Sequence, residues 1–185
     1  MKIKLFYILL LFVLCSCSNL PEKFVNVSEG MQYISDPDNG FVVDTILPNE
    51  VKVQVQLIPA SLIQKTNTAG KQKYFSIQFS YKGNELLAQL PREEYGSYVQ
   101  LFSFGMDRVI KLITADGKEF QADMVSYQPT YSMGKSNELT VVFDQHISKD
   151  QNVTLIVDEF GLQLGTLKFF IDKSRINYSP TIDQL

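Results

Sequence analysis

The chain of 185 residues has no tryptophan, one histidine and two cysteines. The histidine, His146, lies in a polar stretch between two predicted strands, where a solvated loop residue is expected. A Ser-His-Asp or Cys-His mechanism would have to use this residue, yet no Gly-x-Ser-x-Gly segment accompanies it. Because zinc sites draw mainly on cysteine and histidine, we expect no metal site, and nothing indicates another cofactor.

Basic charge is also scarce, with 17 lysines and arginines against 20 acidic residues and a formal net charge of −3. A mildly acidic chain has no electrostatic footprint for nucleic acid or for anionic lipid, so we expect no nucleic-acid partner. Internal repeats and low-complexity blocks are absent, and no window predicts a helix longer than about ten residues.

The first seventeen residues read MKIKLFYILLLFVLCSC. Lys2 and Lys4 form a positive head, and Leu5 to Leu14 is an unbroken apolar run. The thirteen residues from Leu5 to Cys17 would form a helix of about 20 Å, which is shorter than the roughly 30 Å hydrocarbon core of a bilayer. The segment therefore predicts a cleaved export signal rather than a stable membrane span.

Leu14-Cys15-Ser16-Cys17 resembles the lipobox of bacterial lipoproteins, which has a leucine three residues before an invariant cysteine and a small residue just before it. The resemblance implies that residues 1–16 are a signal peptide and that Cys17 carries the lipid that binds the protein to a membrane. Taking Cys15 as the target instead would place the bulky Leu14 directly before the cut. An ordinary secretory signal cut nearby is the alternative.

After the cut, residues 17–23 form a short polar tether that keeps the folded part close to the membrane. In the sorting scheme of diderm bacteria, an aspartate after the lipidated cysteine retains the protein at the inner membrane. Ser18 stands in that place, and the resemblance therefore implies the outer membrane.

Loss of the two signal lysines takes the formal charge from −3 to −5, and 169 residues remain. Cys15 leaves with the signal and Cys17 carries the lipid, so the mature chain has no disulfide and forms one domain held together by burial alone.

Apolar and polar residues alternate with a period of two in five runs, which is the pattern of half-buried strands. These runs are residues 51–57, 75–81, 139–143, 153–157 and 167–171. Asp116-Gly117 stands between two strand-like runs and predicts a hairpin. We also expect strands over 86–90, 99–104 and 109–113, inward positions for Phe120, Ala122 and Met124, and a loosely held tail over 178–185.

Short alternating strands separated by polar turns predict an all-β fold, an antiparallel β-sandwich over residues 24–177. The last three runs resemble consecutive strands of an immunoglobulin-like unit, although no Cys-Trp-Cys core is present, so the resemblance is one of pattern and not of family. The polar stretch 64–73 is either a flexible insertion or a linker between two small lobes.

Aromatic side chains are the leading candidates for ligand binding, because rings at the edge of a sandwich stack on sugars or on a partner protein. The candidate rings are Tyr95, Tyr98, Tyr127 and Tyr131 in predicted loops, and Phe102, Phe104 and Phe170 on strand faces opposite the expected core. The alternative is that these rings complete two buried layers, and the absence of tryptophan weakens the sugar-binding interpretation.

Acidic residues supply the remaining candidates. Glu93-Glu94 and Asp158-Glu159 are paired carboxylates, but sequence neighbours on a strand point to opposite faces, whereas glycosidases need two carboxyls that face each other across a cleft. The stretch 36–40, DPDNG, resembles a calcium loop but is one residue short and lacks the distal glutamate, and turn preference explains the same residues.

Together these patterns predict a lipid-anchored cell-envelope protein with a non-catalytic β-sandwich that acts as an adaptor or binding module for another envelope component. Two alternatives stay open: a carbohydrate-binding accessory lipoprotein of a surface glycan system, and a hydrolase with dispersed carboxylates.

Overall fold

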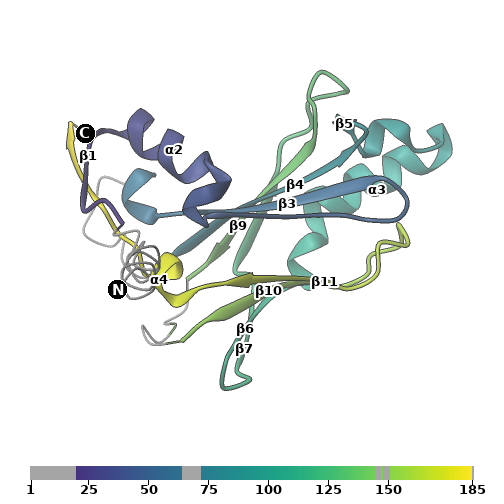
Figure 1. The fold of residues 1–185 in the computed structure, drawn as a ribbon. Coiled ribbons are helices and arrows are strands. Elements are labelled where there is room, and N and C mark those ends of the chain that lie inside the picture. Colours follow the sequence, from purple (N-terminus) through teal and green to yellow (C-terminus); the bar gives the residue numbers. More distant parts are fainter. Residues whose placement is uncertain (1–19, 64–71, 145–146, 148–150, 185) are drawn as a thin grey trace, which may run out of the picture.

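The computed structural model describes residues 20–63, 72–144, 147 and 151–184. Cys17, His146 and most of the 64–73 stretch lie outside the described residues. The chain forms two antiparallel sheets that are not closed into a barrel, with short helices around them (Figure 1). The predicted β-rich, antiparallel sandwich is confirmed.

The larger sheet has six strands in the order β2-β3-β4-β9-β8, with the short β5 paired to β4. They are β2 (Val42–Ile46), β3 (Val51–Ile58), β4 (Lys73–Tyr81), β5 (Asn84–Glu85), β8 (Met124–Tyr127) and β9 (Asn137–Phe143). The central strands are the ones with alternating apolar residues, and their register sets Val55 opposite Ile77 and Ile77 opposite Leu139. All three side chains are buried, so one face of this sheet forms half of the core.

The smaller sheet has the order β11-β10-β6-β7. Its strands are β6 (Ile110–Thr114), β7 (Glu119–Gln121), β10 (Val153–Val157) and β11 (Leu167–Ile171). The predicted hairpin joins β6 to β7, and Gly117 adopts a φ of 83°, a conformation that glycine reaches without steric cost. β9 lies in the larger sheet and β10 in the smaller one, so the chain crosses between the sheets there.

Buried residues from both sheets form one hydrophobic cluster, as a sandwich requires. Leu112, Leu155 and Phe169 of the smaller sheet join the alternating residues of β3, β4 and β9. Phe75 of β4 and Phe143 of β9 meet edge to face with ring centroids 5.8 Å apart. Because no described residue is a cysteine, apolar burial of this kind stabilises the described domain.

Helices account for the largest departures from prediction. They are α2 (Val27–Ser35), α3 (Arg92–Phe104) and α4 (Lys173–Ile176), with 3₁₀ turns η2 (Pro37–Asn39), η3 (Ala60–Leu62), η4 (Leu87–Gln89) and η5 (Met106–Arg108). The strands predicted over 86–90 and 99–104 are therefore wrong. Pro91 caps the start of α3, and Gly105 follows its end. No helix in the described ranges is long and apolar enough to cross a membrane.

The predicted loose tail is also wrong. The tail contains β12 (Thr181–Gln184), which pairs in parallel with β1 (Lys23–Asn26) at the other end of the chain. Tyr178 precedes β12, packs on Phe41 with ring centroids 5.2 Å apart, and donates its hydroxyl to Pro21 O at 2.5 Å. Burial raises the pKa of Tyr178 to about 12.

The predicted inward set of 120–124 is correct for its first two members only. Phe120 and Ala122 are buried, but Met124 is 51% exposed. The chain leaves the smaller sheet after β7 and enters the larger one at β8, where Asp123 donates its N–H to Val142 O while Met124 pairs with the same Val142. Two residues opposite one form a β-bulge, which breaks the alternation.

Candidate functional site

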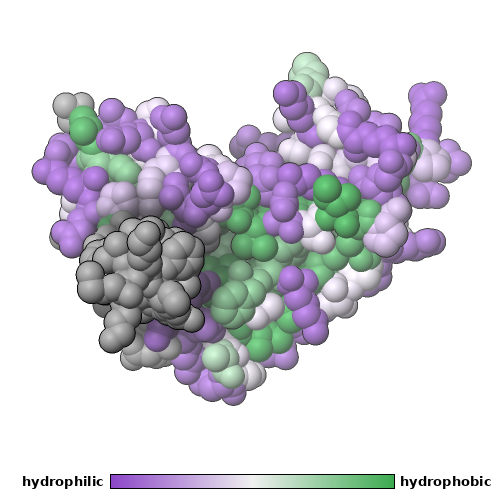
Figure 2. Space-filling view, viewed as in Figure 1, coloured by the Kyte–Doolittle hydropathy of each residue, from purple (hydrophilic) through white to green (hydrophobic). Residues whose placement is uncertain are grey.

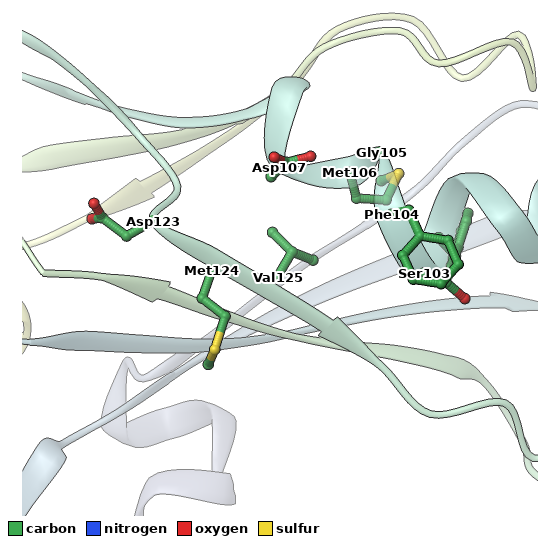
Figure 3. Close-up of a pocket in the computed structure, with 9 residues that line it drawn as sticks. Ser103, Phe104, Gly105, Met106, Asp107, Asp123, Met124 and Val125 are labelled. Carbon is green, nitrogen blue, oxygen red and sulfur yellow. The ribbon is translucent and has the colours of Figure 1, made fainter.

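A groove lies between the C-terminal end of α3, the η5 turn and strand β8 (Figure 3). Its volume is about 270 Å³. We call it the α3–β8 groove, and its walls include Phe104, Met106, Asp107, Asp123, Met124 and Val125. Figure 3 shows Val125 pointing from β8 toward Met106 and Asp107, whereas Met124 points to the other side of the strand.

One large apolar side chain is exposed at this groove. Phe104 is 79% exposed, while Phe102 and Met106 in the same groove are buried. Met124 is 51% exposed, but its side chain points to the other side of β8 (Figure 3). Single exposed apolar residues are common on protein surfaces, but an exposed aromatic ring at a hollow beside a strand edge is typical of an interaction surface.

The end of α3 explains why Phe104 faces outward. Phe102 anchors the helix in the core, with its ring 5.5 Å from Phe79 and 5.4 Å from Tyr127 between centroids. Two residues further on, Phe104 lies on the opposite side of the helix, because successive residues turn by about 100°. The Gly105 N–H then bonds to Leu101 O and ends the helix.

The groove carries negative charge. Asp107 and Asp123 both line it, and Asp123 Oδ2 accepts the Asp144 N–H at 2.7 Å. Among the described residues neither Asp107 nor Asp123 forms an ion pair with a lysine or arginine. The groove therefore combines the exposed ring of Phe104 with carboxylates that no described cation neutralises.

Strand β8 is the last strand of the larger sheet. It pairs with β9 on one side, and within the described ranges no strand pairs with its other side. An unpaired strand edge presents backbone N–H and C=O groups that can pair with another chain. The groove lies beside this edge, since Met124 and Val125 of β8 belong to both.

The four predicted tyrosines do not form one platform. The predicted loop position is correct for Tyr131 only, because Tyr95 and Tyr98 lie in α3 and Tyr127 lies in β8. Tyr131 is 69% exposed, whereas Tyr127 is only 9% exposed and accepts a hydrogen bond from Asn137 Nδ2 at 3.0 Å. Tyr98 donates its hydroxyl to Gly161 O at 2.8 Å, and Tyr95 is half-buried against the core. Burial raises the pKa of both Tyr98 and Tyr127, so these hydroxyls stay neutral.

Tyr131 lies in a loop that a buried carboxylate organises. Glu85 is 1% exposed and accepts hydrogen bonds from Thr130 Oγ1 at 2.6 Å, Ser132 N at 3.1 Å and Gly134 N at 2.7 Å. Burial by itself would raise the pKa of Glu85, but these bonds and one from Asn137 hold it below its usual value. Glu85 thus fixes the loop that presents Tyr131.

The paired carboxylates make structural contacts. Asp158 forms an ion pair with Lys111 at 3.3 Å. Glu159 accepts the N–H groups of Gly161 at 2.7 Å and Gln163 at 3.1 Å, and such backbone bonds hold its pKa below its usual value although burial opposes them. Glu93 and Glu94 are exposed in the first turn of α3. The contacts of Asp158 and Glu159 are therefore structural, and the two carboxylates of Glu93 and Glu94 face solvent.

The 36–40 stretch forms a compact turn. Asp36 Oδ1 accepts the Asp38 N–H at 3.0 Å, Asn39 Nδ2 donates to Tyr33 O at 2.9 Å, and Gly40 has a φ of 74°. Within the described ranges no three histidine, cysteine, aspartate or glutamate residues lie close enough together to hold a metal ion.

Two other hollows carry apolar residues. Figure 2 shows apolar residues gathered between β3 and the β10–β11 pair. A cavity of about 330 Å³ is lined mainly by Leu86, Leu90, Leu162 and Leu164, with no charged side chain. On the outer face of the smaller sheet, Phe170 is 58% exposed at a hollow of about 310 Å³ beside Lys168, Thr154 and Asn152.

Sequence reasoning singles out Phe102, Phe104 and Phe170 as aromatic candidates. Phe104 and Phe170 are exposed, but Phe102 lies in α3 and is buried, so that prediction is wrong for Phe102. Sequence reasoning missed Met124, Asp107 and Asp123 as members of a site. A search for related proteins gives no further assignment: no family model matches the chain, and no match is found among curated proteins or solved structures.

Proposed function

We propose that this protein is a lipid-anchored component of the cell envelope, and that its β-sandwich is a non-catalytic adaptor that binds another envelope protein at the α3–β8 groove. The observation that carries the proposal is the exposure of Phe104 at a hollow beside an unpaired sheet edge. Aromatic side chains are enriched in protein interfaces.

The position of the expected anchor agrees with this role. β1 begins at Lys23, six residues after Cys17, and six residues reach about 20 Å when extended. In Figure 1, β1, β12 and α2 lie together at one end of the molecule, and α3 lies toward the other. Neither β1 nor β12 lines the groove, so lipid attachment leaves it accessible.

Crosslinking in intact envelopes tests the proposal. We expect the wild-type chain to crosslink to a defined envelope protein and Phe104→Ser to lose that product. The matched control is Ile46→Ser, because Ile46 is 72% exposed on β2 at the opposite edge of the same sheet. Equal crosslinking by both variants would move the interface elsewhere on the surface.

A carbohydrate-binding module is the second candidate, and Phe170 is the observation that favours it. An exposed ring next to the polar side chains of Lys168, Thr154 and Asn152 suits stacking on a sugar with hydrogen bonds at its edge. A glycan array distinguishes the candidates. Binding of defined glycans that Phe170→Ala abolishes, together with no protein crosslink, would replace the adaptor function by this one.

A further inference from the structure

The free edge of β8 has the geometry of a strand acceptor. In an antiparallel pair, alternate residues direct their N–H and C=O groups toward the neighbouring strand, and the residues between them direct theirs outward. β9 takes up one side of β8 from Met124 to Tyr127. Half of the backbone groups along this strand therefore point away from β9, where an extended chain can pair with them.

The side chains around that edge indicate which types of side chain the extended partner chain needs. Val125 is half-buried and offers an apolar contact within the groove, and Phe104 offers an exposed ring. Side chains of an added strand alternate between the two faces, so every second one enters the groove. An apolar residue there covers Val125.

The negative charge of the groove sets a second requirement for the side chains of the extended chain. Asp107 and Asp123 lie in the groove wall without a cationic partner among the described residues. A lysine or arginine of the incoming strand would neutralise them. A second copy of this chain docked edge to edge would instead bring two sets of carboxylates together, and like charges in close contact are unfavourable.

We infer that the α3–β8 groove binds an extended, cationic segment of a partner protein, which adds a strand to β8 with apolar and basic side chains in the groove. This inference rests on the proposed adaptor function and specifies its binding mode. Backbone pairing supplies the orientation, and Asp107 and Asp123 select positive charge.

Selection from random twelve-residue peptides displayed on phage tests the chemistry, with the mature lipidated protein in detergent as bait. We expect enriched peptides that alternate apolar residues with lysine or arginine. The double variant Asp107→Asn and Asp123→Asn should bind a selected peptide about 2- to 10-fold more weakly, because exposed charge pairs contribute modestly. Asp38→Asn is the control, since Asp38 lies in η2 outside the groove.

Backbone methylation tests the mode of binding. Methylating alternate amide nitrogens of the selected peptide removes the donors on one of its edges. We expect about tenfold or greater loss of affinity for one methylation pattern and little loss for the other pattern. In NMR spectra, amide signals of β8 (Met124–Tyr127) should shift on adding the unmodified peptide.

The outcomes separate this inference from the proposed function. Equal binding of both methylated peptides, enrichment without basic residues, an empty selection, or self-association through β8 each overturns strand addition by a cationic segment. The adaptor function stands or falls separately, on whether Phe104→Ser loses the crosslinked envelope protein.

Discussion

Glu85 shows how one buried carboxylate organises a surface loop. Its oxygens accept bonds from Thr130, Ser132, Gly134 and Asn137, while Asn137 Oδ1 accepts the Leu87 N–H at 2.8 Å. Tyr131 has a φ of 50° in this loop, an uncommon conformation for a residue with a side chain. The bonds to Glu85 hold the loop in this conformation.

Replacing Glu85 by glutamine tests this role. The amide of Glu85→Gln turns one acceptor into a donor that faces other donors, so at least one buried N–H or O–H group loses its partner. We expect the free energy of unfolding to fall by about 1–3 kcal/mol. Glu93→Gln, at an exposed site in α3, should leave it nearly unchanged. Chemical denaturation of both variants provides the measurement.

The stability difference between wild type and Glu85→Gln should depend on pH. The folded-state pKa of Glu85 lies below its ordinary value of 4.5. Its contribution is therefore fully present above pH 4.5 and is lost as the pH falls through the lower folded-state pKa. The difference in unfolding free energy between wild type and Glu85→Gln should shrink as the pH falls below that value. A constant difference would mean that the charge of Glu85 is unimportant.

Helix α3 carries a glycine that its position does not require. Gly96 is exposed, and a Cβ atom built there meets no heavy atom within 4 Å. Gly96→Ala should raise the free energy of unfolding by about 0.5–1 kcal/mol, because alanine loses less backbone entropy in a helix. Gly117 has equally open surroundings but a φ of +83°. Gly117→Ala should therefore destabilise the protein. Thermal unfolding of both variants measures these opposite changes in stability.

The strands could be predicted because their signal is local. Val51, Val53 and Val55 alternate with polar residues, and the core residues of β4, β9, β10 and β11 likewise recur at every second position. Every second side chain of a strand with one buried face must be apolar, so the sequence records this contact directly.

Helix α3 was missed although it also left a signal. Tyr95, Tyr98, Val99 and Phe102 are spaced as i, i+3, i+4 and i+7, the pattern of one helix face, and all four pack on the core. Valine and phenylalanine favour strands, and Gly96 disfavours helices, so local preference concealed the helical period. The packing of Phe102 in the core outweighed this local preference.

The groove could not be predicted, because its parts meet only through sheet order. Phe104 and Val125 lie in different elements, α3 and β8, and their position at one groove depends on β8 being the edge of a sheet whose neighbour, β9, is itself placed by β4. The bulge at Asp123, which turns Met124 outward, depends on a bond to Val142. No local pattern encodes these pairings.

The two ends of the described chain stabilise each other. β12 brings Ile182 opposite Phe24 of β1, and Phe24 is 5% exposed. Removing residues 181–185 should lower the free energy of unfolding by about 1–3 kcal/mol, because Phe24 becomes accessible to water. Asp183→Asn removes only the exposed ion pair with Lys23 and should change it by less than about 1 kcal/mol. Unfolding in urea distinguishes the two.

The proposed anchor at Cys17 and the proposed binding groove involve different parts of the sequence, and Cys17→Ser tests whether the two functions are independent. Without the sulfur that accepts the lipid, the product should lose its acyl label and leave the membrane fraction. Its affinity for the selected cationic peptide should stay within about twofold of wild type, because the groove is built from α3, η5 and β8 and not from β1. Fractionation, acyl labelling and peptide titration measure these outcomes. A variant that remains membrane-bound with its signal attached would contradict the lipid anchor, whereas lost peptide binding would show that the groove depends on the N-terminal segment.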